Sequence, residues 1–521
     1  MTIKLKLLGA VALVGAFAAT PASAEFANTL GIGQKSSNLG QAGVATASDY
    51  DVFYVNPAGA ANIVTPTIGV GLKVLNTTGL HADEPGFNHD VEATVRGSEN
   101  GYLPSVGAYV PGLLPNVVLG VGFGAVQGFA GDWNNEQPTT FNPTAGLGGT
   151  LGANGADANG LSSYGGTGVE LVLAELTPTV GIKLSDKLNI GASVGFTTLK
   201  HFRVGIDAFI GATVADVADD GVVNNSLGGA AARGHLVAQT SDDIGLPIPP
   251  WGFATSPHEA SFTIGAQYQL LPNVAIGGVF RSESPTEYDL DLVLDAGPFG
   301  TQRGKGTLKL EAPRHVQIGA TVDVTPTLRV SADVKWTNWA NATGIGSPFI
   351  VQIASQTFAP GIPAGGLLGG AISQLVAQPM RGDDTYSIHV GVQYKLMPNL
   401  ELQAGYNYDP AVFDEGNVSY LLYSSDRHIY SLGATIELPD SALLGSTGTW
   451  EWTIGGQFVH YEDRTIDVGQ SATFGLGTPG VAPGATPFSS NSNSWEIGGY
   501  AWTAGLSGVY KFGAPEEVAF K

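Results

Sequence analysis

Short turns alternate with long loops along this chain of 521 residues. Proline presets the dihedral angle of a tight turn, and Asn or Asp tolerates the conformation that follows. The turns are residues 113–117 (LLPNV), 270–274 (LLPNV) and 396–400 (LMPNL), with relatives at 184–188 (LSDKL) and 324–328 (VTPTL). Short turns at one end and long loops at the other are typical of bacterial outer-membrane β-barrels.

The segments between these turns alternate apolar and polar residues, which is the period of a β-strand. In 316–324, for example, Val316 and Ile318 share one face, whereas Gln317 and Asp323 share the other. Because charged residues recur on the polar face, the pattern suits a wet lumen with lipid outside. We predict an all-β transmembrane barrel of about 14 antiparallel strands, in the outer membrane of a Gram-negative cell. The strands are expected near 66–77, 102–111, 117–128, 168–184, 188–203, 258–270, 273–290, 305–324, 327–340, 384–397, 399–408, 427–439, 449–467 and 493–512.

Residues 1–24 have the pattern of a secretory signal peptide. Lys4 and Lys6 precede an apolar stretch at 7–19, and small residues at 22–24 form a cleavage site. We therefore expect an exported chain that begins at Glu25. The chain contains no cysteine, so hydrogen-bonded strands and not disulfides must hold an exported fold together.

The formal net charge of −22 argues against nucleic acid as a partner, since phosphates require a basic surface. The acidic residues fall largely in the predicted loops. They form either a solvated face or a surface that divalent cations bridge to anionic lipid, such as lipopolysaccharide.

No motif of enzyme chemistry stands in a suitable context. Residues 191–195 match the G-x-S-x-G pattern, but they lie inside an alternating strand, and the hydrolase motif needs a strand–turn–helix elbow. His81 and His89 lack a recognisable metal-ligand spacing. We predict no enzyme activity, no metal and no cofactor; an outer-membrane lipase is a weaker alternative.

Residues 25–65 are small and do not alternate. A barrel of fourteen strands encloses a lumen too wide for wall side chains to fill. We predict that 25–65 form a hatch that plugs the lumen, that 66–512 form the barrel, and that 513–521 form a C-terminal tail. Phe512 or Phe520 is the expected signal for the barrel assembly machinery.

An ordered set of short segments resembles a known family, the FadL/TodX-type outer-membrane transporters (OMPP1/FadL/TodX) of long-chain fatty acids and other hydrophobic compounds. The segments are Phe26, 39–42 (LGQA), Asp49, Asn56-Pro57-Ala58, 280–283 (FRSE), 336–339 (WTNW), 408–410 (YDP), 426–427 (DR) and 430–433 (YSLG). The resemblance implies a monomeric, hatch-plugged barrel that takes up hydrophobic molecules by passive diffusion. The alternative is a general porin or adhesin-like barrel with functional extracellular loops.

Candidate substrate contacts fall in two groups. Phe209, Ile210, Trp251 and Phe253 are apolar for predicted loops, and exposed apolar patches often mark binding sites; these loops could equally pack on each other. By resemblance, Phe26 borders an internal pocket.

If the substrate is a carboxylate, a cation should meet it, because burying an unpaired charge is costly. Lys200, Arg203 and Arg381 are candidates by position; the alternative is that they are ordinary charges at the rim of the barrel.

Gly120, Gly122 and Gly124 share one face of the third predicted strand. Glycine weakens a strand and permits a bulge or a close approach of another backbone. By resemblance, this strand is kinked and opens a lateral exit through the wall. The alternative is that the three glycines only fill space in a glycine-rich chain.

Overall fold

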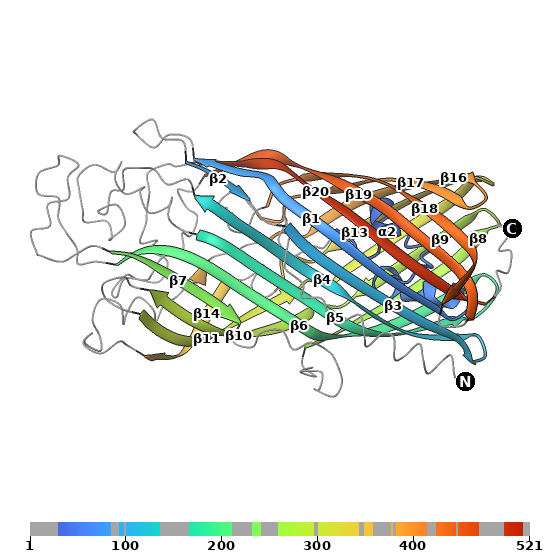
Figure 1. Cartoon of the computed structure of the whole chain (residues 1–521), viewed down its shortest axis with the longest axis horizontal. Helices are drawn as coiled ribbons and strands as arrows, with labels where there is room; N and C mark the ends of the chain where they lie inside the picture. The colour runs from blue at the N-terminus through green and yellow to red at the C-terminus, as the bar shows by residue number, and fades with distance from the viewer. Residues whose placement is uncertain are drawn as a thin grey trace, which may run out of the picture.

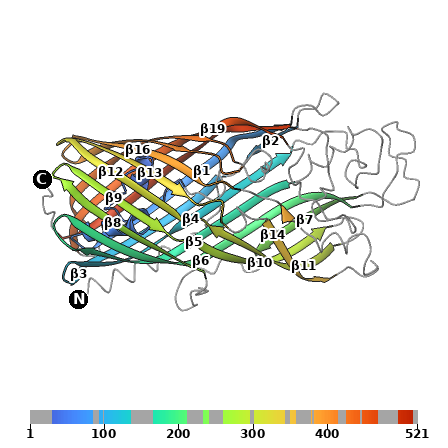
Figure 2. The same ribbon diagram turned by 180° about the vertical axis from the view of Figure 1, so that it is seen from behind.

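The chain forms an antiparallel β-barrel in this computed structural model, which describes residues 30–84, 93–97, 100–135, 166–210, 232–240, 259–295, 301–342, 349–357, 377–378, 382–413, 424–443, 446–467 and 494–513. Within these ranges fourteen strands make a closed wall (Figures 1 and 2). They are β1 (Thr67–Glu84), β3 (Asn100–Leu114), β4 (Val117–Asn135), β5 (Gly166–Lys183), β6 (Leu188–Ile210), β8 (Ala260–Leu271), β9 (Val274–Arg281), β12 (His315–Thr325), β13 (Leu328–Thr337), β16 (Thr385–Met397), β17 (Leu400–Asp409), β18 (Arg427–Leu443), β19 (Ser446–Asp467) and β20 (Ser494–Phe512). Each strand pairs antiparallel with the next in this series, and β20 pairs with β1. The predicted barrel of about fourteen antiparallel strands is confirmed.

Two predicted strands are each divided by an interruption. The predicted strand 273–290 is β9 followed by β10 (Ser284–Asp295), and 305–324 is β11 (Thr301–Ala312) followed by β12. At the first interruption the Ser282 hydroxyl accepts the N–H of Phe262. At the second, Pro313 has no N–H to donate. At both sites the regular hydrogen bonds of the strand ladder are interrupted. The alternation of apolar and polar residues in the sequence nevertheless continues across them.

Six further described strands extend the wall beyond the barrel, at the end opposite the short turns (Figure 1). They are β2 (Ala93–Gly97), β7 (Ala232–Thr240), β10, β11, β14 (Phe349–Thr357) and β15 (Ala377–Gln378). The pairing runs from β6 through β7, β10, β11 and β14 to β15, while β2 pairs with β1 and β4.

The expected long loops at 129–167, 204–257 and 341–383 are therefore partly strand. β4 continues to Asn135, β5 begins at Gly166, and β6 continues to Ile210. Phe209 and Ile210 are thus not loop residues, because they pair in register with Arg233 and Ala232 of β7. Alternation fades in these segments, so the sequence pattern did not reveal that strand pairing continues.

The outer face of the wall is apolar and the inner face is polar. Ile318 and Leu432 are 60% and 69% exposed, as expected for side chains that face lipid. Their strand neighbours Gln317 and Ser431 are buried on the other face. No helix in the ranges above is long and apolar enough to cross a membrane.

Residues 30–65, called here the inner segment, lie within the barrel (Figure 1). The segment contains α2 (Gln34–Asn38), α3 (Val52–Val55) and the 3₁₀-helix η1 (Pro57–Asn62). α2 packs against β17, β18, β19 and β20, whereas η1 packs against β4, β5, β6 and β8. The inner segment therefore contacts opposite sides of the wall.

Glycines in the wall let the backbone of the inner segment approach closely. A Cβ at Gly405 of β17 would lie 2.1 Å from the backbone nitrogen of Gly40, and one at Gly191 of β6 would lie 2.2 Å from the carbonyl carbon of Pro57. Gly191 belongs to the G-x-S-x-G match, so close packing explains this glycine without any hydrolase chemistry.

We expect the folded protein to resist SDS until it is boiled. The fourteen strands close on themselves, with β20 paired to β1, so no strand of the described barrel lies at the edge of an open sheet. Unheated and boiled samples should therefore migrate differently on a gel. Equal mobility, together with recovery of the protein in the soluble fraction, would contradict the barrel.

Candidate functional site

Asn56 ties the inner segment to itself and to the wall. Its side chain is fully buried, and Nδ2 donates to the carbonyls of Val44 at 2.8 Å and Ala266 of β8 at 3.2 Å. Its Oδ1 accepts the N–H of Ala58 at 3.1 Å, which caps η1, and Pro57 occupies the first turn of that helix. The structure thus places Asn56, Pro57 and Ala58 inside the barrel, where the asparagine satisfies peptide groups that have no strand partner.

Two charged wall residues hold other parts of the inner segment. Lys73 Nζ on β1 donates to the carbonyls of Leu30 at 2.7 Å and Gly31 at 2.5 Å. Asp333 Oδ2 on β13 accepts the N–H groups of Gly43 at 2.8 Å and Val44 at 3.0 Å. Neither anchor was predicted. The available signal was a charge at an inward position of an alternating strand.

An apolar cluster lies between the inner segment and the wall. It consists of Ile32, Phe53, Val126, Leu173 and Ala312, with Tyr54 packed against it. These residues come from the inner segment, β4, β5 and β11. Such a surface can hold the hydrocarbon part of a ligand.

A buried ion pair stands beside this apolar cluster. Arg281 Nη2 at the end of β9 donates to Glu175 Oε2 on β5 at 2.5 Å, and the guanidinium lies 5.2 Å from the Tyr54 ring centroid. Ser261 and Ser284 donate to the same carboxylate. The Glu175 carboxylate of β5 therefore contacts both β9, through Arg281, and β10, through Ser284.

The glycines predicted at the exit lie in an intact ladder. Gly120 and Gly124 pair with Tyr109 and Ser105 of β3, and all three glycines also pair with β5. A Cβ at Gly122 would lie 2.0 Å from the Phe53 ring, and one at Gly124 would lie 3.0 Å from Ile32 Cγ2. These glycines make room for the inner segment.

The wall ladder between β3 and β4 stops directly after these glycines. β3–β4 pairing ends at Ser105–Gly124, and β4 is next paired on that side with β2, at Trp133–Gly97. Residues 125–132 of β4 have no paired register there in the described structure, and we call this interval the β3–β4 gap. On its other side, β4 has a bulge at Val126 relative to β5. Val126 belongs to the apolar cluster, which therefore lies directly behind the gap.

Four of the other predicted substrate residues are described, and all four lie on β6. Lys200 Nζ lies 3.0 Å from Glu259 Oε1, and Arg203 is exposed on β6. Phe209 and Ile210 end β6. Phe26, Trp251, Phe253 and Arg381 lie outside the described residues.

A lysine that the sequence analysis did not select occupies the lumen. Lys335 of β13 is 8% exposed, and its ammonium makes no hydrogen bond or ion pair with any described residue. Nearby, Asp409 is already paired with Arg427, whose Nη2 lies 2.6 Å from Asp409 Oδ2. Lys335 is therefore suited to meet a negatively charged ligand group.

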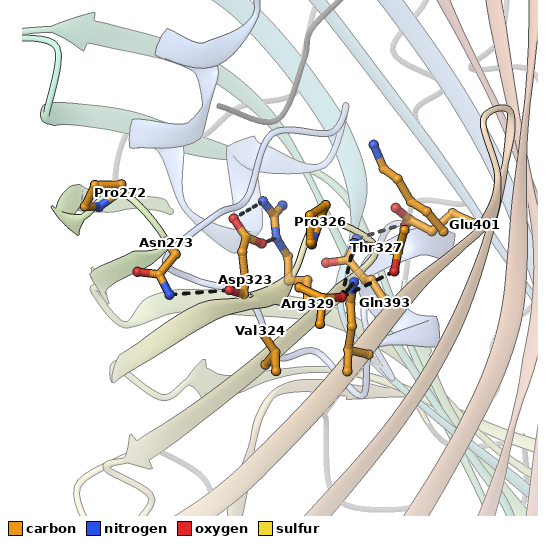
Figure 3. A pocket seen from close by; sticks show the side chains of 12 residues that line it. Pro272, Asn273, Asp323, Val324, Pro326, Thr327, Arg329, Gln393 and Glu401 are labelled. Carbon is orange, nitrogen blue, oxygen red and sulfur yellow. Dashed lines mark hydrogen bonds and ion pairs between the residues drawn. The ribbon is translucent and has the colours of Figure 1, made fainter.

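A cavity of about 310 Å³ lies at the short-turn end of the barrel (Figure 3). It is bordered by the β8–β9 and β12–β13 turns and by β16 and β17. Arg329 holds Asp323 there through two hydrogen bonds, of 2.6 and 3.1 Å. Glu401 also lines the cavity. Its Oε1 accepts a hydrogen bond from Gln393 Nε2 and lies 3.6 Å from Nζ of Lys35 in the inner segment. The cavity thus lies beside α2, at the end of the barrel opposite the six further strands that extend the wall.

We expect Asn56→Asp to loosen the inner segment, because the change removes the two N–H donors that hold Val44 and Ala266. Each of the two lost hydrogen bonds should cost about 0.5–1.5 kcal/mol, although the Val44 carbonyl still accepts from Gln267 Nε2 at 3.3 Å. Limited proteolysis of the inner segment and thermal unfolding measure the effect. Asn62→Asp is the matched control, because Asn62 is exposed and, among the described residues, its side chain bonds to Gln267 and Asn189. Equal effects of the two changes would contradict the anchoring role.

Comparison with solved structures supports the fold. The chain is 12% identical to a Pseudomonas aeruginosa FadL homologue over 94% of this chain and 100% of that chain, with a TM-score of 0.63. It is 14% identical to the Pseudomonas putida toluene transporter TodX over 93% and 99% of the two chains, with a TM-score of 0.59. The corresponding values for the Ralstonia pickettii toluene transporter TbuX are 14%, 93%, 99% and 0.54. Because these sequence identities are low, the similarities support the fold of the chain but not its function.

Sequence comparison bears on the family. No curated protein sequence matches the chain. The sequence profile of the family described as "Outer membrane protein transport protein (OMPP1/FadL/TodX)" matches residues 152–444, which is more than half of the chain. The closed barrel and this match together make the chain a member of the OMPP1/FadL/TodX family of outer-membrane transporters of hydrophobic compounds.

Proposed function

We propose that this protein admits hydrophobic molecules to its lumen and releases them sideways, by passive diffusion, through the β3–β4 gap. The observation that carries the proposal is the position of the apolar cluster directly behind an interval of wall without a paired ladder. Breaking wall hydrogen bonds in lipid would cost several kcal/mol for each unsatisfied group. The free-energy cost of leaving through the wall is therefore lowest where those hydrogen bonds are already missing.

The inner segment is proposed to act as the hatch. It contacts opposite sides of the wall, and the anchors Asn56, Lys73 and Asp333 hold it there. A solute that reaches the apolar cluster therefore meets Ile32 and Phe53 before it can continue along the barrel axis. This supports sideways release over an open aqueous pore.

The alternative of a general porin or adhesin-like barrel makes a different electrical prediction. An open pore conducts ions steadily in a planar bilayer, whereas a plugged barrel barely conducts. Steady conductance of the unmodified protein would favour the porin.

The substrate class follows from two features of the lumen. The apolar cluster suits an alkyl chain or a small aromatic ring, and Lys335 suits a carboxylate. The solved neighbours include a FadL homologue and transporters of toluene, so both kinds of ligand are reasonable for this family. We propose a long-chain carboxylate as the preferred ligand, because a carboxylate would pair with the buried charge of Lys335, whereas a pure hydrocarbon would leave that charge unpaired.

Deletion of Val126 tests the exit. Val126 is the extra residue between Ala125 and Gln127, which pair with Ala174 and Leu173 of β5, so its removal restores a regular strand. We expect uptake of laurate and toluene by cells to fall further than in Val126→Ala, which also removes part of the Val126 side chain from the apolar cluster. Val126→Ala is the control, since it keeps the bulge and removes only part of the side chain.

Unchanged uptake after the deletion of Val126, at normal surface abundance, would place the exit elsewhere. Gly122→Val, in contrast, should weaken binding as well as uptake, because its Cβ would displace Phe53 from the apolar cluster. Gly124→Ala should have a milder effect, because only the flexible Ile32 side chain must move.

Lys335→Gln tests the ligand class. Losing a hydrogen bond to a charged group costs about 1.5–3 kcal/mol, so laurate should bind at least tenfold more weakly. Toluene binding should not change. Lys309→Gln is the control, because Lys309 is 65% exposed on β11 and pairs with Glu287. Laurate affinity that is equal in Lys335→Gln and the parent would exclude this lysine from the site.

A further inference from the structure

Three buried acceptor atoms on adjacent strands have no hydrogen-bond partner among the described residues. They are Asp333 Oδ1 on β13, His389 Nε2 on β16 and Asn407 Oδ1 on β17. Register places the three residues side by side, because Asp333 pairs with His389 and His389 pairs with Asn407. All three residues are buried, so bulk water does not satisfy these atoms. A buried acceptor without a donor costs free energy, and the row therefore needs an explanation.

The unpaired oxygen of Asp333 faces away from the other two atoms. The second oxygen, Oδ2, accepts the N–H groups of Gly43 and Val44, and it also accepts the amide of Gln317 at 2.9 Å. Oδ1 lies over Gly319 of β12, where a Cβ would overlap it. Asp333 is therefore occupied in holding the inner segment, and its free oxygen is directed towards β12 and not towards β16.

Bonds already present fix the orientation of His389 and Asn407. Nδ1 of His389 lies 2.8 Å from the Gly40 carbonyl oxygen, and a carbonyl only accepts. The neutral ring therefore carries its proton on Nδ1, which leaves a lone pair on Nε2. Asn407 Nδ2 donates to Asp409 Oδ2 at 3.3 Å, so Oδ1 is the free end of that amide. The two facing residues thus offer acceptors alone, and only a ligand group that donates a hydrogen bond can pair with them.

The buried ammonium of Lys335 lies close to these two acceptors. Lys335 pairs with Ser387, which stands two residues before His389 on β16. Diagonal neighbours of this kind have Cβ atoms about 7–8 Å apart, which long side chains can bridge. Lys335 supplies a positive charge, whereas His389 and Asn407 supply acceptors. A ligand that satisfies both needs an anionic group and a hydrogen-bond donor close to each other.

The apolar cluster is within reach of this position. Register joins Arg281 of β9 to His315 of β12, and His315 to Thr337 of β13. Two inter-strand spacings amount to about 10 Å, and Lys335 stands two residues from Thr337. At the other end, Arg281 lies 5.2 Å from the ring centroid of Tyr54, which packs against the apolar cluster. A long alkyl chain whose head group meets Lys335 can therefore extend to the cluster.

We propose that the lumen selects long-chain carboxylates that carry a hydroxyl group near the carboxylate, such as 3-hydroxy acids. Lys335 pairs with the carboxylate, and His389 Nε2 and Asn407 Oδ1 share the hydroxyl proton in a three-centre hydrogen bond. The inference rests on the proposed transport function and narrows its ligand class.

The preference is measured as the ratio of the Kd for laurate to the Kd for 3-hydroxylaurate, with the purified full chain. We expect 3-hydroxylaurate to bind at least about fivefold more tightly, which corresponds to one net hydrogen bond. 12-Hydroxylaurate has the same hydroxyl at the far end of the chain, where it would enter the apolar cluster. It should bind no more tightly than laurate.

Two substitutions remove the acceptors. In His389→Asn the amide nitrogen can take the place of Nδ1 and keep the bond to Gly40, while no atom replaces Nε2. In Asn407→Leu the side chain keeps its shape and loses its oxygen. Each variant should lower the preference for 3-hydroxylaurate over laurate, and the double variant should bring the ratio to about one.

Gln457→Leu is the matched control. Like Asn407→Leu, it replaces a buried amide on the inner face of the wall by an alkyl group. It removes the bond from Gln457 Nε2 on β19 to the Ser37 carbonyl of the inner segment, which is 3.3 Å long. Limited proteolysis of the inner segment should become faster in this variant, and the preference for 3-hydroxylaurate should remain.

The outcomes separate this inference from the proposed function. If the parent binds neither laurate nor 3-hydroxylaurate, the proposed transport of carboxylates is wrong and the inference falls with it. If the parent binds both equally tightly, or if the double variant keeps the preference, carboxylate binding stands and these two acceptors do not select the ligand.

Discussion

A wall that crosses lipid must pair its own backbone groups, and this requirement shapes the whole structure. The fourteen strands satisfy it by closing on themselves, with β20 returning to β1. An interval of wall without strand pairing therefore costs free energy, and its presence needs a physical explanation. The described wall has such an interval between β3 and β4, and the buried side chains of the apolar cluster lie behind it.

The lumen shows the complementary solution for backbone that cannot join a sheet. The inner segment takes its partners from side chains: the amide of Asn56, the ammonium of Lys73 and the carboxylate of Asp333. Wall glycines such as Gly191 and Gly405 bring the two backbones close enough for these bonds. A polar inner face is therefore more than a lining for water, because it also holds the segment that fills the lumen.

Much of the architecture could be predicted from the sequence, because turn chemistry and alternation are local. The fourteen strands, and the family through ordered motifs such as Asn56-Pro57-Ala58, came from local signals. The β3–β4 gap did not, because a missing ladder depends on which strand lies next to β4. For the same reason Gly122 suggested an opening, whereas its Cβ position is filled by Phe53 from a distant part of the chain. Lys335 was visible as one charge on a polar face, but only the three-dimensional structure shows that it makes no hydrogen bond or ion pair with a described residue.

The β3–β4 gap is extended in the direction of the strands. Residues 125–132 of β4 span roughly 27 Å at the rise of an extended strand, about 3.4 Å per residue. A compact ring would occupy only a small part of that length. A long alkyl chain would instead lie along β4 and leave side-on, without turning to pass through the wall end first. The same opening would then release short and long cargo in different orientations.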